Sequence, residues 1–225
     1  MIVSVHMPKT AGRSFEAALR RRFGAAILED YGTYPLNTPP GVRQRAAIEA
    51  CLAHASQAFD GIDCIHGHFL PIRYLLLASA RPVTFVTWLR HPVQRVLSHY
   101  HYWHRAYDPA TAPPLHRRVV EEQWSLERFC LSDEMRNVYA QFLWGFPIDN
   151  FDFVGITEHY DDDLAYFARR YLEIEIPSER VNAVLAPGEG HQVDPDLERR
   201  IAACHARDMA LYERALEARQ ARPVS

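Results

Sequence analysis

Lysine is nearly missing from this sequence, and so are closely spaced cysteines and long apolar runs. The four cysteines, Cys51, Cys64, Cys130 and Cys204, are far apart and form no Cys-x-x-Cys pair, which argues against a zinc site and a disulfide framework. No apolar run approaches the roughly 18 residues of a membrane span, and the first residues lack the features of a signal peptide. We therefore expect a cytoplasmic protein without a membrane span.

The charge and composition exclude further classes. The formal net charge is -3 at pH 7, whereas dedicated nucleic-acid binders are usually basic. Hydrophobic residues make up 48% of the chain and charged residues 24%, which is the balance of a globular protein rather than a disordered one. With 225 residues and neither an internal repeat nor a long linker, we expect one domain over residues 1–225.

The shortage of lysine makes the single lysine informative. Of 25 basic residues, only Lys9 is not an arginine. An ammonium group is a compact point charge, whereas a guanidinium group is a planar fork. The one ammonium group lies in a loop of small residues, which suggests that this loop needs it. Chance placement under a genomic bias toward arginine is the alternative.

Strand-like and helix-like segments alternate along the chain. Short apolar runs rich in β-branched residues, typical of parallel strands covered on both faces, occupy residues 2–6, 62–66, 83–89 and 153–156. Helical patterns occupy residues 14–23, 43–59, 93–105, 124–131, 133–144, 160–171 and 196–219. The alternation predicts an α/β fold with a central parallel sheet flanked by helices. After residue 213 we expect a solvated helix end that frays.

The loop Pro8 to Ser14 follows the first predicted strand and begins the first predicted helix. Such a turn directs backbone N–H groups and the positive helix end toward one point, which makes an anion site. Lys9 adds a full charge there, and Thr10 and Ser14 add hydroxyl donors. The pattern differs from the nucleotide loop G-x-x-x-x-G-K-[ST], because here lysine precedes glycine. A capped strand-to-helix turn without a ligand is the simpler alternative.

A second candidate anion site combines Arg90 and Ser98. Arg90 ends the strand predicted at residues 83–89, and open α/β sheets bind ligands at the carboxyl ends of their strands. Ser98 lies on the second turn of the helix that Pro92 begins. A guanidinium group and a hydroxyl group can hold one phosphate between them. An arginine paired with a carboxylate, beside a solvated serine, is an equal alternative.

The run His66-Gly67-His68 ends the second predicted strand at the same sheet edge. An unperturbed histidine titrates near pH ~6.5 and can accept a hydroxyl proton. Residues two positions apart in a strand point to one side, and Gly67 would give an acceptor close access to the backbone. With 12 histidines in the chain, a pair that is merely hydrogen-bonded is the alternative.

Three further histidines, His99, His101 and His104, include an i, i+3 pair that suits a metal site. No acidic or cysteine residue stands beside them at ligand spacing. We therefore favour a packing or substrate-facing role and expect no metal.

Together these segments resemble sulfotransferases that use 3′-phosphoadenosine 5′-phosphosulfate (PAPS). Residues 8–14 resemble the family's 5′-phosphosulfate loop, and Arg90 with Ser98 and the intervening Arg95 resembles its 3′-phosphate segment. The greatest likeness is to the uronyl/heparan sulfate 2-O-sulfotransferase branch, whose loop is similar to His-x-Pro-Lys-Thr-Ala-Gly and which has a similar His-Gly-His. The likeness continues in the strand at residues 153–156, which ends in Thr-Glu. Arg13 departs from the family's small hydroxyl residue.

The resemblance implies a three-layer, P-loop-like sulfotransferase fold and a bacterial-type soluble enzyme. It implies transfer of a sulfuryl group from PAPS to a hydroxyl group of a glycan or sugar-containing small molecule, without a metal. Lys9 would stabilise the leaving group, and either His66 or His68 would be the general base. The donor would contact Lys9, Thr10, Ala11, Gly12, Arg13, Ser14, Arg90, Ser98 and, from a late segment, Arg180. For Arg180, an arginine that only lies on the surface is an equal alternative.

Two other functions share the anion-binding loop. A kinase or hydrolase of nucleoside triphosphates would need Mg²⁺ and an acidic strand end, which residues 87–89 lack. A protein that only binds a nucleotide would not need the histidines at the sheet edge.

Overall fold

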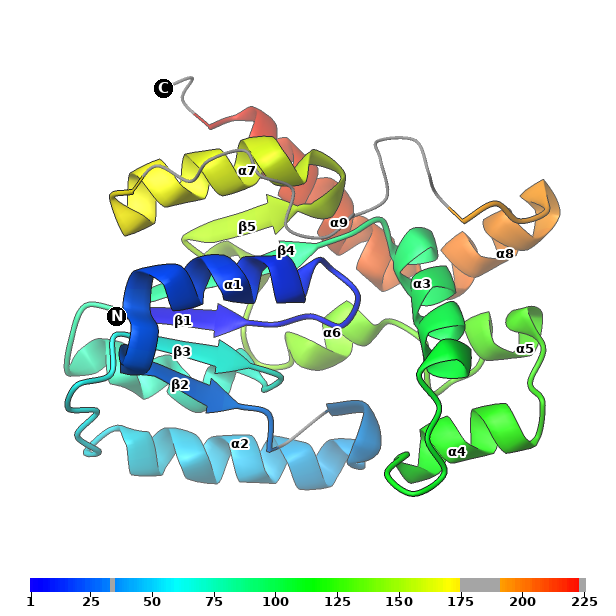
Figure 1. Ribbon diagram of the computed structural model, residues 1–225, viewed down its shortest axis with the longest axis horizontal. Coiled ribbons are helices and arrows are strands. Elements are labelled where there is room, and N and C mark those ends of the chain that lie inside the picture. Colours follow the sequence, from blue (N-terminus) through cyan, green and yellow to red (C-terminus); the bar gives the residue numbers. More distant parts are fainter. Residues whose placement is uncertain (33–34, 175–190, 223–225) are drawn as a thin grey trace.

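Five short strands pair in parallel to form the sheet at the centre of the molecule (Figure 1). The computed structural model describes residues 1–32, 35–174 and 191–222, without the side chains of Arg13 and Pro35. The strand order is β2-β3-β1-β4-β5. The strands are β1 (Ile2–Val5), β2 (Ile27–Asp30), β3 (Cys64–Gly67), β4 (Thr84–Leu89) and β5 (Phe153–Ile156). Because all of them are parallel, their carboxyl ends meet at one edge.

Helices and helical turns connect the strands. The α-helices are α1 (Gly12–Phe23), α2 (Pro40–His54), α3 (Pro92–Arg105), α4 (Pro114–Glu121), α5 (Leu126–Cys130), α6 (Val138–Phe142), α7 (Tyr160–Phe167), α8 (Pro195–Cys204) and α9 (Ala206–Gln220). The 3₁₀ turns are η1 (Gly24–Ala26), η2 (Pro35–Asn37), η3 (Pro71–Ser79), η4 (Ile148–Asn150) and η5 (Thr157–His159), and η6 (Ala168–Leu172) is a π-helical turn.

Each face of the sheet has its own apolar cluster, because side chains alternate between the faces along a strand. Ile2 packs with Phe15 of α1 and Phe167 of α7 on one face. Val3 belongs to the cluster on the other face, with residues of α6 and α9 such as Tyr139. The expected α/β fold, with a parallel sheet flanked by helices, is therefore confirmed.

A third apolar cluster lies beyond the carboxyl edge of the sheet. Helices α3, α4, α5 and α8 form it, with Val96, Trp103, Val119, Phe129 and Ile201 among its buried members. Figure 1 shows these helices side by side at the end of the sheet toward which the strands point. The carboxyl ends of the strands therefore face α3.

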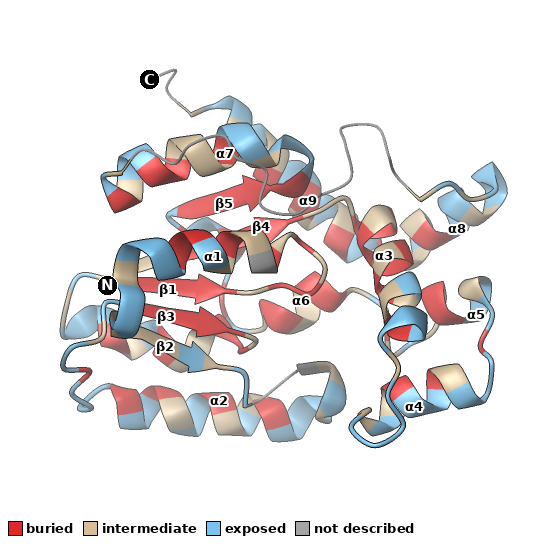
Figure 2. Cartoon of the chain, viewed as in Figure 1, coloured by how far each residue is buried: buried red, intermediate tan, exposed pale blue. Residues whose placement is uncertain are grey.

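Several elements differ from the sequence-based expectation. Strand β2 was not predicted; it is an edge strand whose residues are only partly buried (Figure 2), so it lacks an apolar run. Helix α4 was also missed. The helix predicted at residues 196–219 is two helices, α8 and α9, which meet at His205. No helix in the described part of the chain is long and apolar enough to cross a membrane.

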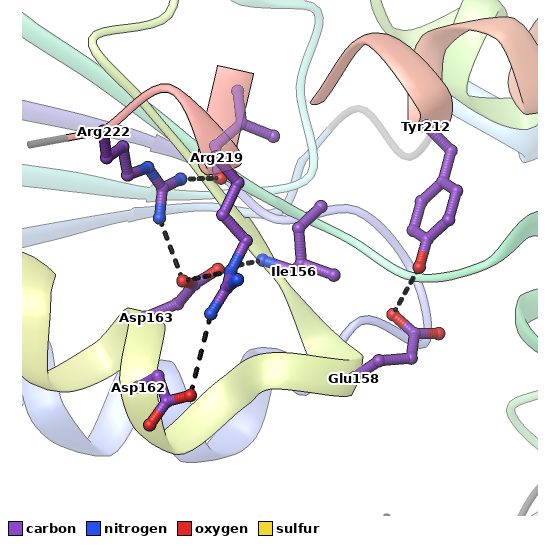
Figure 3. Close-up of polar contacts among 8 residues, drawn as sticks. Ile156, Glu158, Asp162, Asp163, Tyr212, Arg219 and Arg222 are labelled. Atoms are coloured by element: carbon purple, nitrogen blue, oxygen red, sulfur yellow. Dashed lines mark hydrogen bonds and ion pairs between the residues drawn. The ribbon is translucent and has the colours of Figure 1, made fainter. Parts of the chain in front are cut away.

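The end of α9 is anchored, contrary to the expectation of a fraying tail. Arg219 and Arg222 donate to Oδ1 of Asp163, at 2.8 and 2.9 Å, and the other oxygen of this carboxylate accepts the N–H of Ile156 at 2.7 Å (Figure 3). The Asp163 side chain is only 3% exposed. A buried carboxylate with two arginine partners and a strand N–H therefore fastens α9 to β5.

Candidate functional site

The loop between β1 and α1 is a tight turn held by its own main chain. Lys9 and Ala11 have positive φ angles of 68° and 65°, a left-handed conformation that is uncommon outside glycine. The carbonyl oxygen of Ala11 accepts the N–H groups of Ser14 and Phe15, at 3.1 and 3.2 Å, so it caps α1. The left-handed residues place the loop's remaining N–H groups at the start of the helix, where they suit an anion.

Thr10 does not offer its hydroxyl group to a ligand in this conformation, unlike the sequence-based expectation. The Thr10 hydroxyl donates to the carbonyl oxygen of Met7 at 2.9 Å, and the residue is 1% exposed. Its contribution to anion binding would therefore come from the backbone. Ser14 is partly exposed on the first turn of α1, and this first turn contains no acidic residue.

Lys9 connects the loop to helix α3. Its Nζ lies 4.0 Å from the centroid of the Tyr102 ring, which is a cation–π contact. Tyr102 follows Ser98 by four residues, so the two side chains lie on one face of α3. The lone lysine and the candidate phosphate-binding serine are thus brought to the same side of α3.

Arg90 leaves the sheet at the end of β4, and the structure holds its main chain tightly. The hydroxyl group of Tyr139 donates to the carbonyl oxygen of Arg90 at 2.8 Å and accepts its N–H at 2.9 Å. Burial lowers the pKa of Arg90, and the carboxylate of Glu158 opposes this shift. Arg95, by contrast, is 0% exposed and packs 5.7 Å from the Tyr139 ring. It therefore lies in the core.

The chain returns to this area at His191. Gln94 of α3 donates to the carbonyl oxygen of His191 at 3.1 Å and accepts its N–H at 2.8 Å. Burial, His101, Arg90 and Lys9 lower the pKa of His191, in decreasing order, so the charges of Arg90 and Lys9 act on this ring. Arg180 lies outside the described residues.

Three histidines gather at the carboxyl ends of β1 and β3. The His6 ring stacks on those of His66 and His68, with centroid distances of 5.2 and 4.3 Å. The Tyr31 ring meets the His68 ring edge-on at 5.0 Å, and its hydroxyl group lies 3.2 Å from Nδ1 of His6. His66 and His68 therefore lie on one side, as two residues at alternate strand positions should.

The two candidate bases differ in environment. His66 is 1% exposed and shares a 2.8 Å hydrogen bond with the Ser4 hydroxyl through Nδ1. Burial, with His68 as a lesser cause, lowers the pKa of His66 to about 3. His68 is partly exposed, and burial lowers its pKa to about 4. Its Nδ1 donates to the carbonyl oxygen of His6 at 2.5 Å, so the neutral ring carries its lone pair on Nε2.

His6 and Tyr31 were not identified from the sequence. The signal for His6 was its position directly after a buried strand, next to the loop. Gly12 supports it: a Cβ atom at this position would lie 1.6 Å from Nε2 of His6. Gly12 therefore makes room for a histidine ring beside the loop.

The reason for a glycine at position 67 differs from the one expected from the sequence. A Cβ atom here would lie 1.9 Å from the carbonyl oxygen of Asp30, its neighbour in β2. Gly67 thus allows close strand pairing rather than access for an acceptor.

The metal interpretation of the α3 histidines gains nothing from their positions. His99 is buried beside Trp103, whereas the His101 ring lies 4.6 Å from the His191 ring and the His104 ring 4.3 Å from the Tyr100 ring, both in tilted contacts. The three rings pack against different neighbours.

Comparisons with known proteins add little. Neither a protein-family model nor a curated protein sequence matches the chain. The structure is similar to the crystal structure of a sulfotransferase from Alicyclobacillus acidocaldarius, with a TM-score of 0.49 and 17% identity over 99% of this chain and 96% of that chain. A likeness at this TM-score and identity does not assign an activity, so the function must be argued from the site.

Proposed function

We propose that this protein is a sulfotransferase that moves a sulfuryl group from PAPS to an acceptor hydroxyl group, with a carbohydrate as the favoured acceptor. One observation carries the proposal: three adjacent parallel strands, β3, β1 and β4, end beside one another. His68, the Lys9 loop and Arg90 directly follow the ends of these three strands. A donor with two separated phosphates and an acceptor hydroxyl would need these three kinds of group.

The loop and Lys9 would bind the 5′-phosphosulfate. Backbone N–H groups at the start of α1 would hold the phosphate, and the ammonium group of Lys9 would stabilise the negative charge that develops on the bridging oxygen as the sulfuryl group leaves. Arg90, with Ser98 of α3, would hold the 3′-phosphate through charge-assisted hydrogen bonds. Arg13 and Arg180 remain proposed donor contacts from the sequence alone.

We assign the role of general base to His68 rather than His66. Its Nδ1–H is committed to the carbonyl oxygen of His6, so Nε2 would accept the proton from the acceptor hydroxyl. The acceptor oxygen would then bond to sulfur while the bond between sulfur and the phosphate oxygen breaks, releasing adenosine 3′,5′-bisphosphate. The lowered pKa keeps His68 neutral at pH 7. A bound anionic donor would raise that pKa and strengthen the base.

Calorimetry with adenosine 3′,5′-bisphosphate and with ATP tests the donor class. We expect the bisphosphate to bind at least about tenfold more tightly, because only it has a 3′-phosphate for Arg90. Equal or weaker binding than ATP would overturn the proposal in favour of a triphosphate enzyme. Radiolabelled PAPS with a panel of sugars, lipid-linked sugars and other hydroxylated molecules would then identify the acceptor.

A further inference from the structure

The turn after β4 is hydrogen-bonded at three consecutive residues. Thr157 donates its hydroxyl hydrogen to the carbonyl oxygen of Leu89 at 3.0 Å. Tyr139 binds both main-chain groups of Arg90, and Glu158 accepts the N–H of the following residue at 2.8 Å. The main chain is therefore fixed at the point where Arg90 leaves the sheet.

Helix α9 binds two of these residues, Tyr139 through its main chain and Glu158 through its side chain. The carboxylate of Asp208 accepts the N–H groups of Tyr139 and Ala140, each at 3.0 Å, and caps α6 from the neighbouring helix. The hydroxyl group of Tyr212 donates to the second oxygen of Glu158 at 3.1 Å (Figure 3). Because Asp208 and Tyr212 are four residues apart, they lie on one face of α9.

We infer that α9 positions the turn of Arg90 and His91 through two hydrogen-bond chains, one from Asp208 through Tyr139 and one from Tyr212 through Glu158. We call these four residues positioning residues. Tyr139 and Glu158 bind the main chain of the turn, and Asp208 and Tyr212 bind Tyr139 and Glu158 in turn. The inference rests on the proposed function only for the ligand that Arg90 holds.

The two hydrogen-bond chains matter because Arg90 and His91 lie beyond the end of β4, where no strand in the described part of the chain pairs with their main chain. The carbonyl group of Leu89 is buried and both main-chain groups of Arg90 are partly buried, and unpaired groups there would cost stability. Helix α9 is a firm support, because Asp163 fastens its far end to β5. A guanidinium group that must meet a phosphate with good geometry benefits from a fixed main chain.

Two single-hydroxyl deletions test the positioning itself, without any ligand. Tyr139→Phe removes the hydrogen-bond acceptor of the Arg90 N–H, and Tyr212→Phe removes the support of Glu158. We expect amide hydrogen exchange to accelerate about three- to tenfold at Arg90 and at His91, respectively. Tyr171→Phe is the matched control. The Tyr171 hydroxyl group donates to the carbonyl oxygen of Asp152, just before β5 and therefore at the amino ends of the strands, away from Arg90. Unchanged exchange at both amides would overturn the inference.

Affinities for two nucleotides test the consequence for binding. Adenosine 3′,5′-bisphosphate and adenosine 5′-monophosphate differ only in the 3′-phosphate. We expect the two site variants to lose about three- to tenfold of the wild-type preference for the bisphosphate, with little change for the monophosphate. A preference retained in both variants would refute the role of α9 in binding. If the wild-type protein shows no preference, the proposed function fails, and the exchange measurements alone decide the inference.

Discussion

At the scale of single residues, the candidate site depends on how one ammonium group and three imidazole rings are surrounded. The ammonium group of Lys9 lies over the Tyr102 ring in a cation–π contact. His68 is held in one tautomer by the carbonyl oxygen of His6. These surroundings are the reason why we propose leaving-group stabilisation for Lys9 and proton acceptance for His68.

Lys9→Ala should lower the rate of sulfuryl transfer about 10²- to 10³-fold, because it removes a charge directed at the leaving group. The free energy of unfolding should change little, since the side chain contributes no core packing. Lys9→Arg should restore only part of the rate, because a planar guanidinium group does not reproduce the point charge. Steady-state kinetics and urea unfolding check both variants. A near wild-type rate for Lys9→Ala would contradict the role of this residue.

His68→Asn should lower kcat about 10²-fold or more, because it removes the proton acceptor while its amide can still donate to the carbonyl oxygen of His6. His66→Asn should mainly lower stability, since His66 is buried and hydrogen-bonded to Ser4. Kinetics and unfolding of each single variant and of the double variant separate the two roles. If His68→Asn and the double variant keep full kcat, neither histidine is the base.

At the scale of elements, contacts at the ends of helices α1 and α9 position the residues of the candidate site. Helix α1 starts at Gly12, beside the His6 ring, and the end of α9 is fastened to β5 through Asp163 of α7. Each contact can be tested by comparing a substitution that breaks it with the same substitution at a similar residue that lacks the contact.

Gly12→Ala should displace His6, because the new Cβ would lie 1.6 Å from its ring. We expect a loss of about 1–3 kcal/mol in the free energy of unfolding, as for overpacked sites. Gly41→Ala is the control, because a Cβ atom added at this position of α2 would meet no described neighbour within 4 Å. Adding His6→Ala to Gly12→Ala should recover much of the lost stability. Chemical denaturation of these variants measures the effects, and equal stability of Gly12→Ala and Gly41→Ala would contradict the clash.

Asp163→Asn should destabilise the protein by about 2–3 kcal/mol, because two partly buried arginines lose their shared carboxylate. Asp162→Asn is the matched control: its side chain is 82% exposed and its ion pair with Arg219 is 3.7 Å long. It should cost about 0.5 kcal/mol or less. Urea unfolding compares them, and similar losses for both would disprove the anchoring role of Asp163.

At the scale of the whole molecule, buried neutral histidines make stability depend on pH. Burial lowers the pKa of His66 to about 3 and those of His68 and His205 to about 4. Below pH ~6.5 the unfolded chain binds protons at these residues and the folded chain does not. Their contribution to the free energy of unfolding is therefore present above pH ~6.5. It is lost as the pH falls toward the pKa values of the folded state.

The loss should amount to about 1.4 kcal/mol per pH unit for each histidine. Asp208 works in the opposite direction, because burial raises its pKa to about 6 and protonation then favours the folded state. We expect the three histidines to outweigh it, so the free energy of unfolding should be several kcal/mol lower at pH 5 than at pH 7. Urea titrations at both values measure the difference, and equal stability would falsify the expectation.

The sequence by itself determined the alternation of strands and helices, because apolar runs and periodicity are local. It also located the loop around Lys9, Arg90 after β4 and the pair His66 and His68, because a strand end followed by polar residues is a local pattern. It missed β2, whose edge position leaves no apolar run.

Only the tertiary structure decided which groups meet. His6, Tyr31 and His68 come from three different strand ends, and their stacking depends on the strand order and on the close approach that Gly12 permits. The support of Arg90 by Tyr139, and of Tyr139 by Asp208, joins residues 49 and 69 positions apart. Contacts over such separations arise from packing, and no local pattern of residues encodes them.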